Sequence, residues 1–473
     1  MHVVMFADQH LESLGGAQVS MRLQKRFLER AGHVVTVVAP RLHRPAAHDP
    51  AYLDLPSIAL TPDREYALTW PGARTDRFLD AEMGARLPVD VVHVQGDFWG
   101  AFIGHRYAAR HGLPVVHTMH NRVDVGIEAT APFPGLVLRA LNAWARRALP
   151  RGASRGSAGV LPRDGSARAL PRGVRGGAGS RRNARNSDFS GSFIRDRRES
   201  PSSATASDRA TASERATASA RATASDRATA SARAGGGWAF LRQLARLSRA
   251  VTAPSSHFAR RLEAHGVAEK VDVIWNGIDD DVLDAALSAE ASTRRPGRPR
   301  FIWLGRMSPE KRLLPFLEAV AASGIDAEVE IVGGGAQLRA ARRLVERSTP
   351  TATVTFAGRL AYAETLRRLA DADAVVQTSI GFETQGMTVF EAASLGTPAV
   401  VSDPDIAAEL GAGTWTVTDA TIPALAEALR RAASDISAGT PVVPDPTIAE
   451  RFRQSSRTAA MIAVYERAVA AGR

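Results

Sequence analysis

The stretch Gly381–Asp403, GFETQGMTVFEAASLGTPAVVSD, determines how the rest of the chain is interpreted. It holds two glutamates, Glu383 and Glu391, with seven residues between them, and Gly386 lies between the two. The run TVFEAASLG after Gly386 is typical of a short helix, which Gly396 and a nearby proline end before the apolar run PAVVSD. The pattern therefore predicts a loop, a helix and a buried strand in that order.

The two glutamates lie on either side of the predicted helix start. Glu383 falls in the loop before the helix and Glu391 about one turn inside it, so both carboxylates can reach one ligand. The first-turn amides of Gly386, Met387 and Thr388 point to the same place, where a helix N-terminus favours a phosphate or another anion. The arrangement suits a nucleotide sugar, with phosphates at the helix end and hydroxyls on the carboxylates.

Strands and helices alternate through most of the sequence, which is typical of doubly wound α/β domains. The first block opens with the strand HVVMFAD, a loop containing Gly15 and Gly16, and a helix; a second block begins at the strand FIWLGR. The predicted fold class is α/β with two Rossmann-like domains. The expected boundaries are 1–150 and 236–279 for the N-terminal domain, 151–235 for an insertion within it, 280–299 for a linker, 300–446 for the C-terminal domain and 447–473 for a final helix.

The composition argues against several classes of protein. The chain has no cysteine, which excludes disulfides and thiolate metal sites. Its first residues lack the basic flank and apolar core of a signal peptide, and no run of about 18 apolar residues could span a membrane. We therefore expect a cytoplasmic protein, acting at the inner face of the plasma membrane if its acceptor is a lipid.

The positive charge is concentrated in the predicted insertion. The whole chain carries +11, and residues 151–234 contribute +10 of it through 17 Arg against 7 Asp or Glu. The folded body is therefore close to neutral, and no nucleic acid is expected as its partner. The motif Ala-Thr-Ala-Ser-x-Arg repeats five times there without a large apolar residue, so the insertion is predicted to be disordered. It could serve as a basic tether to anionic lipid or nucleic acid, or be a tolerated surface insertion.

A second group of candidate residues lies in the loop RMSPEK after the strand FIWLG. Arg306 and Lys311 flank this loop, and strand ends in such sheets face the ligand crevice. A guanidinium and an ammonium there could clamp a diphosphate without a metal. From their spacing alone, a solvated basic loop is an equally good interpretation.

Further candidates lie at the ends of other predicted strands. His120 ends the strand VVHTMH; a single strand histidine is more often structural than functional. Gly15 and Gly16, and Gly333 and Gly334, follow strands where glycine would allow a backbone to approach a ligand closely. Ordinary strand-to-helix turns explain these glycines equally well.

The motifs together resemble the retaining glycosyltransferases of family 4, which have two facing Rossmann-like domains (the GT-B architecture). The Glu-x7-Glu stretch, the G-R-x4-K pattern and the strand-end histidine occur in the family's order, and the resemblance covers nearly all of the chain outside the insertion. The form ETQG and the run VVHTMHNRVD look like the subgroup containing diacylglycerol glucosyltransferases and phosphatidylinositol mannosyltransferases. One departure is PDIAAEL after PAVVSD, where the family commonly has a Gly-Gly pair followed by a glutamate.

The resemblance implies a role for each candidate residue. Arg306 and Lys311 would clamp the donor diphosphate, Glu383 would hold sugar hydroxyls and Glu391 the ribose. His120 would face the donor sugar. The remaining candidates would lie beside the diphosphate or nucleotide; they are Gly15, Gly16, Gly333, Gly334, Gly386, Met387 and Thr388. The N-terminal domain would bind the acceptor, the C-terminal domain the nucleotide sugar, and the last helix would cross back to the first domain.

The implied activity is metal-independent transfer of a hexose from a nucleotide sugar, with UDP-glucose favoured and GDP-mannose next, to a sugar or lipid hydroxyl. No cofactor or metal is expected, and the Asp-x-Asp patterns at 371–373 and 403–405 are interpreted as structural. Arg22, Lys25, Arg26 and Arg30 on the first helix are a candidate basic face for an anionic membrane, or simply its solvated side. Two alternatives are a nucleotide-sugar epimerase on the same fold and a non-catalytic nucleotide-sugar-binding protein.

Overall fold

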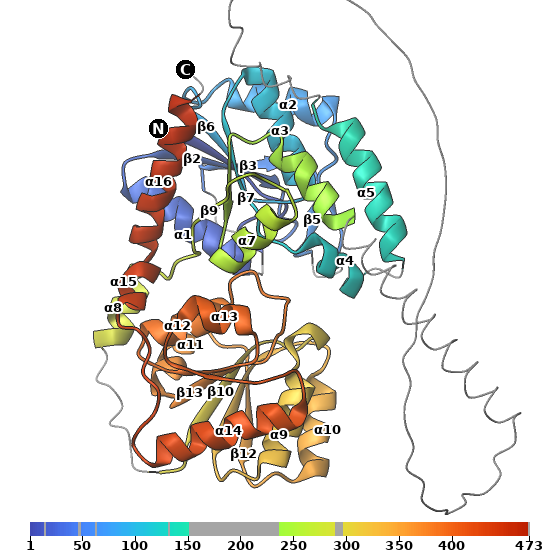
Figure 1. The fold of residues 1–473 in the computed structure, drawn as a ribbon. Helices are drawn as coiled ribbons and strands as arrows, with labels where there is room; N and C mark the ends of the chain where they lie inside the picture. Colours follow the sequence, from blue (N-terminus) through green and yellow to red (C-terminus); the bar gives the residue numbers. More distant parts are fainter. Residues whose placement is uncertain are drawn as a thin grey trace, which may run out of the picture. The chain divides into compact units, whose positions relative to one another are not determined.

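The computed structural model describes residues 1–13, 16–45, 49–61, 64–130, 133–150, 236–288 and 297–471, all within one compact unit. The predicted insertion at 151–235 and the candidate residue Gly15 lie outside the described residues. The remainder forms two parallel sheets, each flanked by helices (Figure 1). This confirms the predicted α/β fold with two Rossmann-like domains.

The sheet of the first domain has the strand order β3-β2-β1-β6-β7-β8-β9, and all its pairings are parallel. The order reverses between β1 and β6, where Val3 pairs with Val91. In open α/β sheets ligands bind at such a reversal, beyond the carboxyl ends of the strands. The strands are β1 (His2–Phe6), β2 (Val34–Pro40), β3 (Tyr52–Leu55), β6 (Val91–Val94), β7 (Val115–Thr118), β8 (Ala250–Ala253) and β9 (Asp272–Val273), with a separate antiparallel pair β4 (Ile58–Ala59) and β5 (Ala67–Leu68).

Helices cover both faces of the first sheet, because its central strands are rich in apolar residues and must be buried on each side. The apolar run of β1, for example, is buried at every position. The helices are α1 (Gly16–Arg30), α2 (Ala73–Met83), α3 (Trp99–His111), α4 (Val123–Thr130), α5 (Pro134–Ala148), a helical segment at 236–245, and α7 (Ser256–Ala264).

The second domain repeats this plan with the strand order β12-β11-β10-β13-β14-β15. Here the order reverses between β10 and β13, where Phe301 pairs with Ala374. Glycines allow β10 and β11 to approach closely: Gly333 has φ 127°, and a Cβ there would lie 2.0 Å from the carbonyl oxygen of Gly305. The strands are β10 (Arg300–Arg306), β11 (Glu328–Gly334), β12 (Thr353–Gly358), β13 (Ala374–Gln377), β14 (Ala399–Val401) and β15 (Thr414–Thr416).

The helices of the second domain form two layers around its sheet. One layer packs with Phe301, Trp303 and Ile331, and the other with Ile302 and Val375, as expected for alternate residues of buried strands. The first layer contains α9 (Leu313–Ser323), α10 (Leu338–Ser348) and α14 (Ile422–Ser437). The second contains α8 (Asp280–Ser288), α11 (Tyr362–Asp371), α12 (Met387–Ser394), α13 (Pro404–Leu410) and α15 (Thr447–Phe452). A short 3-10 helix, η1 (Pro309–Lys311), precedes α9.

An aromatic cluster anchors α12, the helix predicted from the Glu-x7-Glu stretch. The ring of Phe390 lies 5.1 Å from that of Trp275 and 5.5 Å from that of Phe452. All three side chains are buried, and burying each one stabilises the fold by about 2–3 kcal/mol. The cluster fixes α12 against α15 and thereby orients its first turn.

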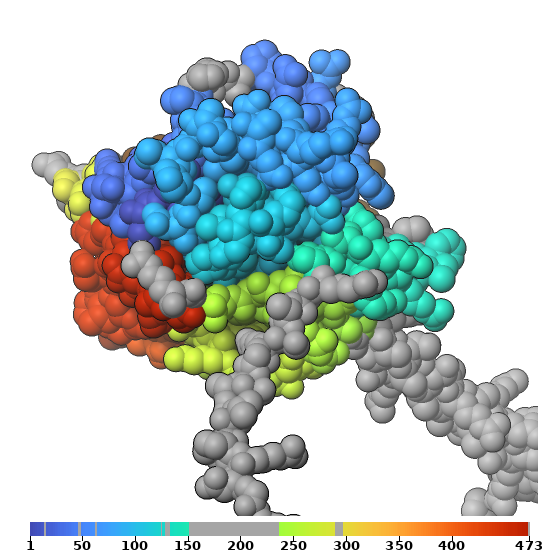
Figure 2. Space-filling model, turned by 90° about the horizontal axis from the view of Figure 1, so that it is seen from above, coloured from blue at the N-terminus to red at the C-terminus, as the bar shows by residue number. Residues whose placement is uncertain are grey.

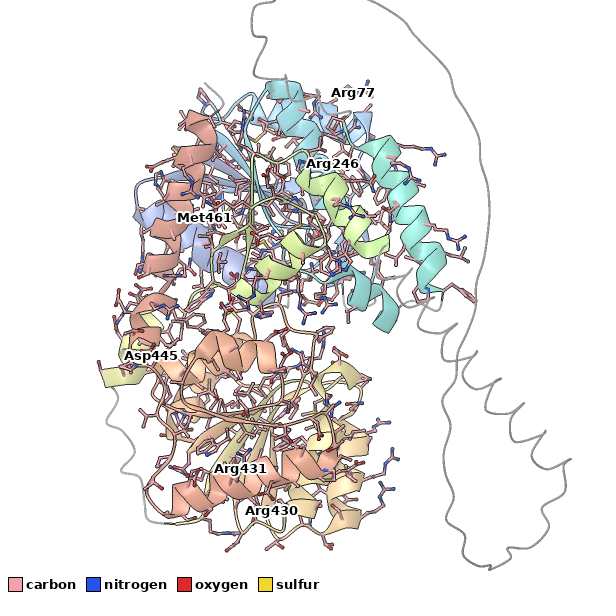
Figure 3. The ribbon with its side chains drawn as sticks, viewed as in Figure 1. Arg77, Arg246, Arg430, Arg431, Asp445 and Met461 are labelled. Carbon is pink, nitrogen blue, oxygen red and sulfur yellow. The ribbon has the colours of Figure 1, made fainter. Side chains whose placement is uncertain are left out.

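The chain end differs in detail from the single helix predicted at 447–473. It divides at Arg453, where ψ is 139°, into α15 and α16 (Gln454–Ala470). Helix α16 packs on the first domain beside α1 (Figures 1 and 2), through buried residues that include Met461, labelled in Figure 3, and Tyr465. The predicted linker begins with α8, and its residues 289–296 lie outside the described part of the chain. None of the described helices has the length and apolar character needed to cross a membrane.

Candidate active site

A cavity of about 310 Å³ lies at the strand-order reversal of the second sheet. Its wall includes Leu304 of β10 and Gln377 of β13, and residues of the first domain close it from the other side. The candidate residues that line it are Gly16, His120, Lys311, Glu383, Gly386, Met387 and Thr388. The structure thus brings together candidates separated by more than 350 positions in the sequence.

Lys311 and Glu383 form an ion pair in this cavity. The Lys311 ammonium donates to Oε1 of Glu383, which also accepts from Ser379 Oγ at 2.8 Å. The two side chains are 23% and 17% exposed, so solvent and ligands reach both. Because the pair is accessible and only partly screened, an incoming phosphate can compete with the glutamate for the ammonium.

The backbone under Lys311 is held by buried groups. Thr378 Oγ1 donates to the Lys311 carbonyl oxygen at 2.6 Å and accepts from Trp303 Nε1 at 2.9 Å. Arg312, the next residue, has φ 55° and ψ 37°, the left-handed conformation that costs a residue with a Cβ about 1–2 kcal/mol. The ammonium is therefore presented by a fixed but strained turn.

Arg306, the other predicted diphosphate ligand, does not line the cavity. Its side chain is 65% exposed and donates to Glu310 at 3.0 Å and to Ser308 Oγ at 3.3 Å. Arg306 is the last residue of β10, and its long side chain is exposed to solvent. A rotation away from Glu310 would be required before it could contact a ligand in the cavity.

The first turn of α12 forms one wall of the cavity. Gly386 has φ 81°, a left-handed backbone conformation that favours glycine, while a Cβ on it would meet only the movable end of the Ile406 side chain, at 2.9 Å from Cδ1. Met387 and Thr388 follow directly and also line the cavity. The free amides of this turn provide the positive end of the helix beside Lys311.

Glu391 lies in the same helix but outside the cavity lining. Its side chain is buried, with the residue 7% exposed, and it accepts a hydrogen bond of 2.9 Å from the Tyr362 hydroxyl. Burial raises the pKa of Glu391 to about 7, while the bond from Tyr362 acts in the opposite direction. This carboxyl is therefore poised to change its charge near neutral pH.

His120 lies just beyond the carboxyl end of β7 and is buried against the cavity. Its Nε2 lies 3.2 Å from Oε1 of Gln95, and its carbonyl oxygen accepts from Thr384 Oγ1 at 3.1 Å. Burial lowers the pKa of His120 to about 4, against the opposing charge of Asp97. The imidazole is therefore neutral at physiological pH.

Side chains of the first domain donate hydrogen bonds to the backbone of the loop that carries Glu383. Arg122 Nη1 donates to the Gly381 carbonyl at 2.7 Å, and Ser255 Oγ donates to the Thr384 carbonyl. Gln385 and Asn276 exchange two bonds between side-chain amide and backbone, of 2.9 and 3.1 Å. The position of Glu383 therefore depends on both domains.

Glu409 of α13 provides a further contact between the domains. Its carboxylate accepts from the Ser256 amide at 2.9 Å, from the His257 amide at 3.3 Å and from Trp275 Nε1 at 2.9 Å. It thus caps the N-terminus of α7, and hydrogen bonds from His257, Ser256 and Trp275 lower the pKa of Glu409 to about 2 despite burial. This glutamate belongs to the segment PDIAAEL, where the sequence departs from the family pattern.

The glycine candidates separate into two groups. Gly16 begins α1 and lines the cavity, whereas Gly333 and Gly334 do not. Gly333 of β11 lies so close to β10 that packing alone requires glycine at this position, without any ligand.

Both Asp-x-Asp patterns are used within the fold. Asp371 pairs with Arg367 at 2.8 Å, and Asp373 accepts from the Arg300 amide at 2.9 Å. Asp403 caps α13 by accepting from the Asp405 amide at 3.0 Å, and Asp405 pairs with Arg261. Among the described residues no three acidic or histidine side chains are grouped as metal ligands.

The basic face expected on the first helix is compensated by neighbouring acceptors. Lys25 lies 2.9 Å from both Glu29 and Asp49, and Arg30 lies 2.6 Å from Asp281. Arg26 pairs with Asp279, and Arg22 donates to the Leu11 carbonyl. The candidate cations of α1 thus pair with carboxylates or a carbonyl, while the side chains of Arg26 and Arg30 stay 43% and 49% exposed.

Sequence reasoning missed several residues that line the cavity. Asn276 was not singled out and Gln385 appeared only within the motif ETQG, although the two connect the domains at the cavity wall. Asn121 and Ser379 were not singled out at all. The only available signal was their position directly after a strand or next to a motif residue.

Two glycosyltransferase families match the sequence. Residues 14–170 and 224–282 match "Glycosyltransferase Family 4", and residues 298–435 match "Glycosyl transferases group 1". No curated protein matches the sequence.

Solved glycosyltransferases share the fold over nearly the whole chain. HepE of Anabaena, solved with UDP and glucose, is 14% identical with a TM-score of 0.57, covering 99% of this chain and 100% of HepE. Sucrose-phosphate synthase of Thermosynechococcus elongatus is 15% identical with a TM-score of 0.58 and 99% coverage of both chains. The catalytic domain of starch synthase IV of Arabidopsis thaliana, bound to ADP and acarbose, is 13% identical with a TM-score of 0.55 and 99% coverage of both.

Proposed function

We propose that this chain, whose two parts match glycosyltransferase models, is a glycosyltransferase that transfers a hexose from a nucleotide sugar to an acceptor hydroxyl, retaining the anomeric configuration and using no metal ion. The observation that carries this proposal is the cavity in which Lys311, Glu383 and the first turn of α12 meet His120. One ligand with a diphosphate and a sugar would satisfy all of these groups together.

The leaving diphosphate would lie between Lys311 and the first-turn amides of α12. Negative charge develops on this group as the bond to the sugar breaks, so donors already aimed at it lower the barrier. The phosphate would displace Glu383 from Lys311, and Arg306 would turn away from Glu310 to contribute a second cation. The freed Glu383 carboxylate would then accept from sugar hydroxyls, close to the positive charge that builds at the anomeric carbon.

Glu391 would bind the ribose hydroxyls in its ionised form, since a carboxylate can accept from two neighbouring hydroxyls. This requires Tyr362 and Glu391 to open toward the nucleotide. The acceptor proton would leave on the departing phosphate, because the Glu383 carboxylate and the His120 imidazole are both assigned to hydroxyls of the donor sugar.

UDP-glucose is the favoured donor and GDP-mannose the next. Support comes from the ETQG form of the motif and from HepE, which has been solved with UDP-glucose. Starch synthase IV was solved with ADP, so proteins of this fold take different nucleotides. The acceptor is proposed to be the hydroxyl of a sugar or of a membrane lipid.

The test is a transfer assay in EDTA with UDP-glucose, GDP-mannose or ADP-glucose as donor, and with sugars or diacylglycerol vesicles as acceptors. We expect acceptor-dependent release of one nucleotide and an α-linked product by proton NMR of the anomeric signal. A β-linked product would contradict retention, and loss of activity in EDTA would contradict metal independence. Conversion of the donor into an epimeric nucleotide sugar, or tight binding without turnover, would replace the proposal with one of the two alternatives.

A further inference from the structure

A chain of buried hydrogen bonds connects His120 with the crossing helix α16. Every member is at most 9% exposed, and the members come from α1, β6 and the loop after it, β7 and its end, β8 and α16. The links are His120 Nε2 to Gln95 Oε1 (3.2 Å), Gln95 Nε2 to Gln24 Oε1 (2.7 Å), Gln24 Nε2 to the Tyr465 hydroxyl (3.2 Å), that hydroxyl to His93 Nδ1 (2.7 Å), His93 Nε2 to Thr118 Oγ1 (2.7 Å), and Thr118 Oγ1 to Thr252 Oγ1 (2.6 Å).

The donors along this chain all point in one direction. Gln95 donates through its amide nitrogen to Gln24, so its carbonyl oxygen is the atom that faces His120. With the Gln95 amide in this orientation its carbonyl oxygen can only accept, so His120 Nε2 carries the proton. The Tyr465 hydroxyl accepts from Gln24 and so donates to His93 Nδ1, which leaves His93 to donate through Nε2 to Thr118.

A second contact supports the same direction. Gln95 Nε2 also lies 3.4 Å from His93 Nδ1, so an amide donor and the Tyr465 hydroxyl both face that ring nitrogen. Such a nitrogen is an acceptor in a neutral imidazole. Burial holds the pKa of both His93 and His120 below the ordinary value of 6.5, so both rings are neutral and each has one defined donor nitrogen.

His120 separates two cavities. On one side is the candidate active site; on the other is a cavity of about 20 Å³ lined by Gln24, Gln95 and Met461, among others (Met461 is labelled in Figure 3). The smaller cavity has room for about one water molecule. Among the described residues Nδ1 of His120 has no hydrogen-bond partner, so this unprotonated nitrogen is the ring atom left for a ligand.

We propose that Gln95 is a positioning residue that holds His120 as its Nε2–H tautomer, and that the Tyr465 hydroxyl of α16 joins the two arms of the hydrogen-bond chain on which Gln95 depends. His120 then presents Nδ1 as an acceptor to a hydroxyl of the donor sugar. The assignment of a sugar to this side of the cavity rests on the proposed function. The tautomer itself does not, because it is a property of the free protein.

The direction matters because the reversed chain would also be internally consistent. If the side-chain amides of Gln95 and Gln24 were both flipped end for end, every donor in the hydrogen-bond chain would become an acceptor. His120 would then carry its proton on Nδ1. It could then only donate to the sugar. The hydroxyl of Tyr465, which is 441 positions from Gln24 in the sequence, lies at the centre of the chain and is shared by both arms.

The experiment is long-range nitrogen–proton NMR of the whole protein labelled with nitrogen-15 in histidine. The His120 signals are assigned by their absence in the spectrum of His120→Ala. The wild type is expected to show a protonated Nε2 and an unprotonated Nδ1. Gln95→Leu should give a mixture of the two tautomers, whereas Gln95→Glu should keep Nε2 protonated, since a carboxylate also accepts.

Tyr465→Phe and Thr458→Val form the matched pair. Each removes one buried hydroxyl from α16, but Thr458 bonds Gln454 and lies outside the chain. We expect Tyr465→Phe to broaden or mix the His120 signals and Thr458→Val to leave them unchanged. A protonated Nδ1 in the wild type, an unchanged tautomer in Gln95→Leu, or equal effects of the two α16 variants would each overturn the proposal.

Kinetics of the same variants then connect the tautomer with the reaction. Gln95→Leu should lower kcat about tenfold, as is typical of the loss of one hydrogen bond to the reacting ligand, while UDP affinity stays within about twofold. Unchanged kcat with a mixed tautomer would overturn the role of Nδ1 as an acceptor. Failure of the wild type to bind any nucleotide would instead contradict the proposed function and leave the tautomer assignment standing.

Discussion

The two domains hold their cavity side chains by different means. The second domain presents charges: Lys311 and Glu383 neutralise each other on short loops that solvent can reach. The first domain presents a neutral imidazole, His120, at the end of a buried chain of amides and hydroxyls. Charges on loops can be exchanged for those of a ligand, whereas a buried neutral chain fixes one geometry before the ligand arrives. If the proposed function holds, the second domain would respond to the nucleotide and the first domain would supply a rigid surface for the sugar.

Replacing Glu383 should have the largest effect and would show whether the charged side of the cavity is catalytic. In Glu383→Ala, kcat should fall about 100- to 1000-fold, because a carboxylate beside the developing positive charge is lost. UDP affinity should be retained or increase, since Lys311 no longer has a competing partner. Calorimetry beside the transfer assay measures both quantities. A tenfold weaker UDP affinity would mean that Glu383 serves nucleotide binding instead.

Replacing Lys311 tests the other half of the pair. Lys311→Met should weaken UDP binding about 10- to 100-fold, the usual effect of losing a charge-assisted hydrogen bond of about 1.5–3 kcal/mol. Arg343→Met is the matched control, because it removes an exposed arginine of α10 that does not line the cavity. Equal affinities in the two variants would show that the ammonium does not contact the nucleotide.

Glu409 tests whether contacts between the two domains contribute to stability. Glu409→Gln should lower the free energy of unfolding by about 1–3 kcal/mol at pH 7, because a charged acceptor of several buried donors is lost. The pKa of Glu409 is about 2 in the folded protein against an ordinary 4.5, so its contribution is complete above pH 4.5 and is lost as pH falls toward 2. The difference between wild type and variant in urea unfolding should shrink over that range.

The exposed Glu427 provides the control for Glu409. Glu427→Gln also removes one carboxylate that pairs with an arginine, Arg430, but on the surface of α14. Such pairs contribute little, so the variant should unfold within about 0.5 kcal/mol of the wild type. A Glu409 variant that behaves like this control would contradict the contact between α13 and α7.

The charge of Glu391 should make nucleotide affinity depend on pH. Its pKa is about 7, so the ionised fraction rises from pH 6 to pH 8, and UDP should bind up to about tenfold more tightly over that range. The affinity should rise with pH because the ionised carboxylate of Glu391 is the form proposed to accept hydrogen bonds from the ribose hydroxyls. In Glu391→Gln, which cannot ionise, the dependence should disappear. The same slope in both proteins would place the titrating group elsewhere.

The smallest effect is expected at Arg312, in the strained turn beside Lys311. Arg312→Gly should raise the free energy of unfolding by about 0.5–1 kcal/mol, because glycine adopts φ 55° without the steric cost of a Cβ. Arg343→Gly, in the middle of α10, should lower it by about 1 kcal/mol. Thermal unfolding of the two variants would distinguish local strain from a general effect of glycine.

Much of the fold follows from local sequence patterns. The alternation of apolar strands and amphipathic helices identifies both domains, and positions after strand ends identify Lys311 and His120, which both line the cavity. The Glu-x7-Glu stretch correctly gives a loop followed by the short helix α12. These features depend on residues within a few turns of one another, which is the range that periodicity describes.

Other features depend on tertiary contacts that no local pattern contains. Gln24 meets Tyr465 across 441 positions, and Glu409 caps a helix that begins 153 positions earlier. The exposure of Arg306 and the burial of Glu391 depend on neighbours, Glu310 and Tyr362, whose direction the sequence does not specify. The spacing of Arg306 and Glu391 within their motifs predicted that each reaches the ligand. It could not predict where their side chains lie in the free protein.

The most direct test of the nucleotide-sugar site is calorimetric titration of the full chain with UDP, GDP and ADP in the presence of EDTA, repeated with Lys311→Met. The proposed site requires tight binding of one nucleotide, UDP first, and a loss of about 10- to 100-fold in the variant. No binding of any nucleotide to the wild type, or equal binding to wild type and variant, would contradict it.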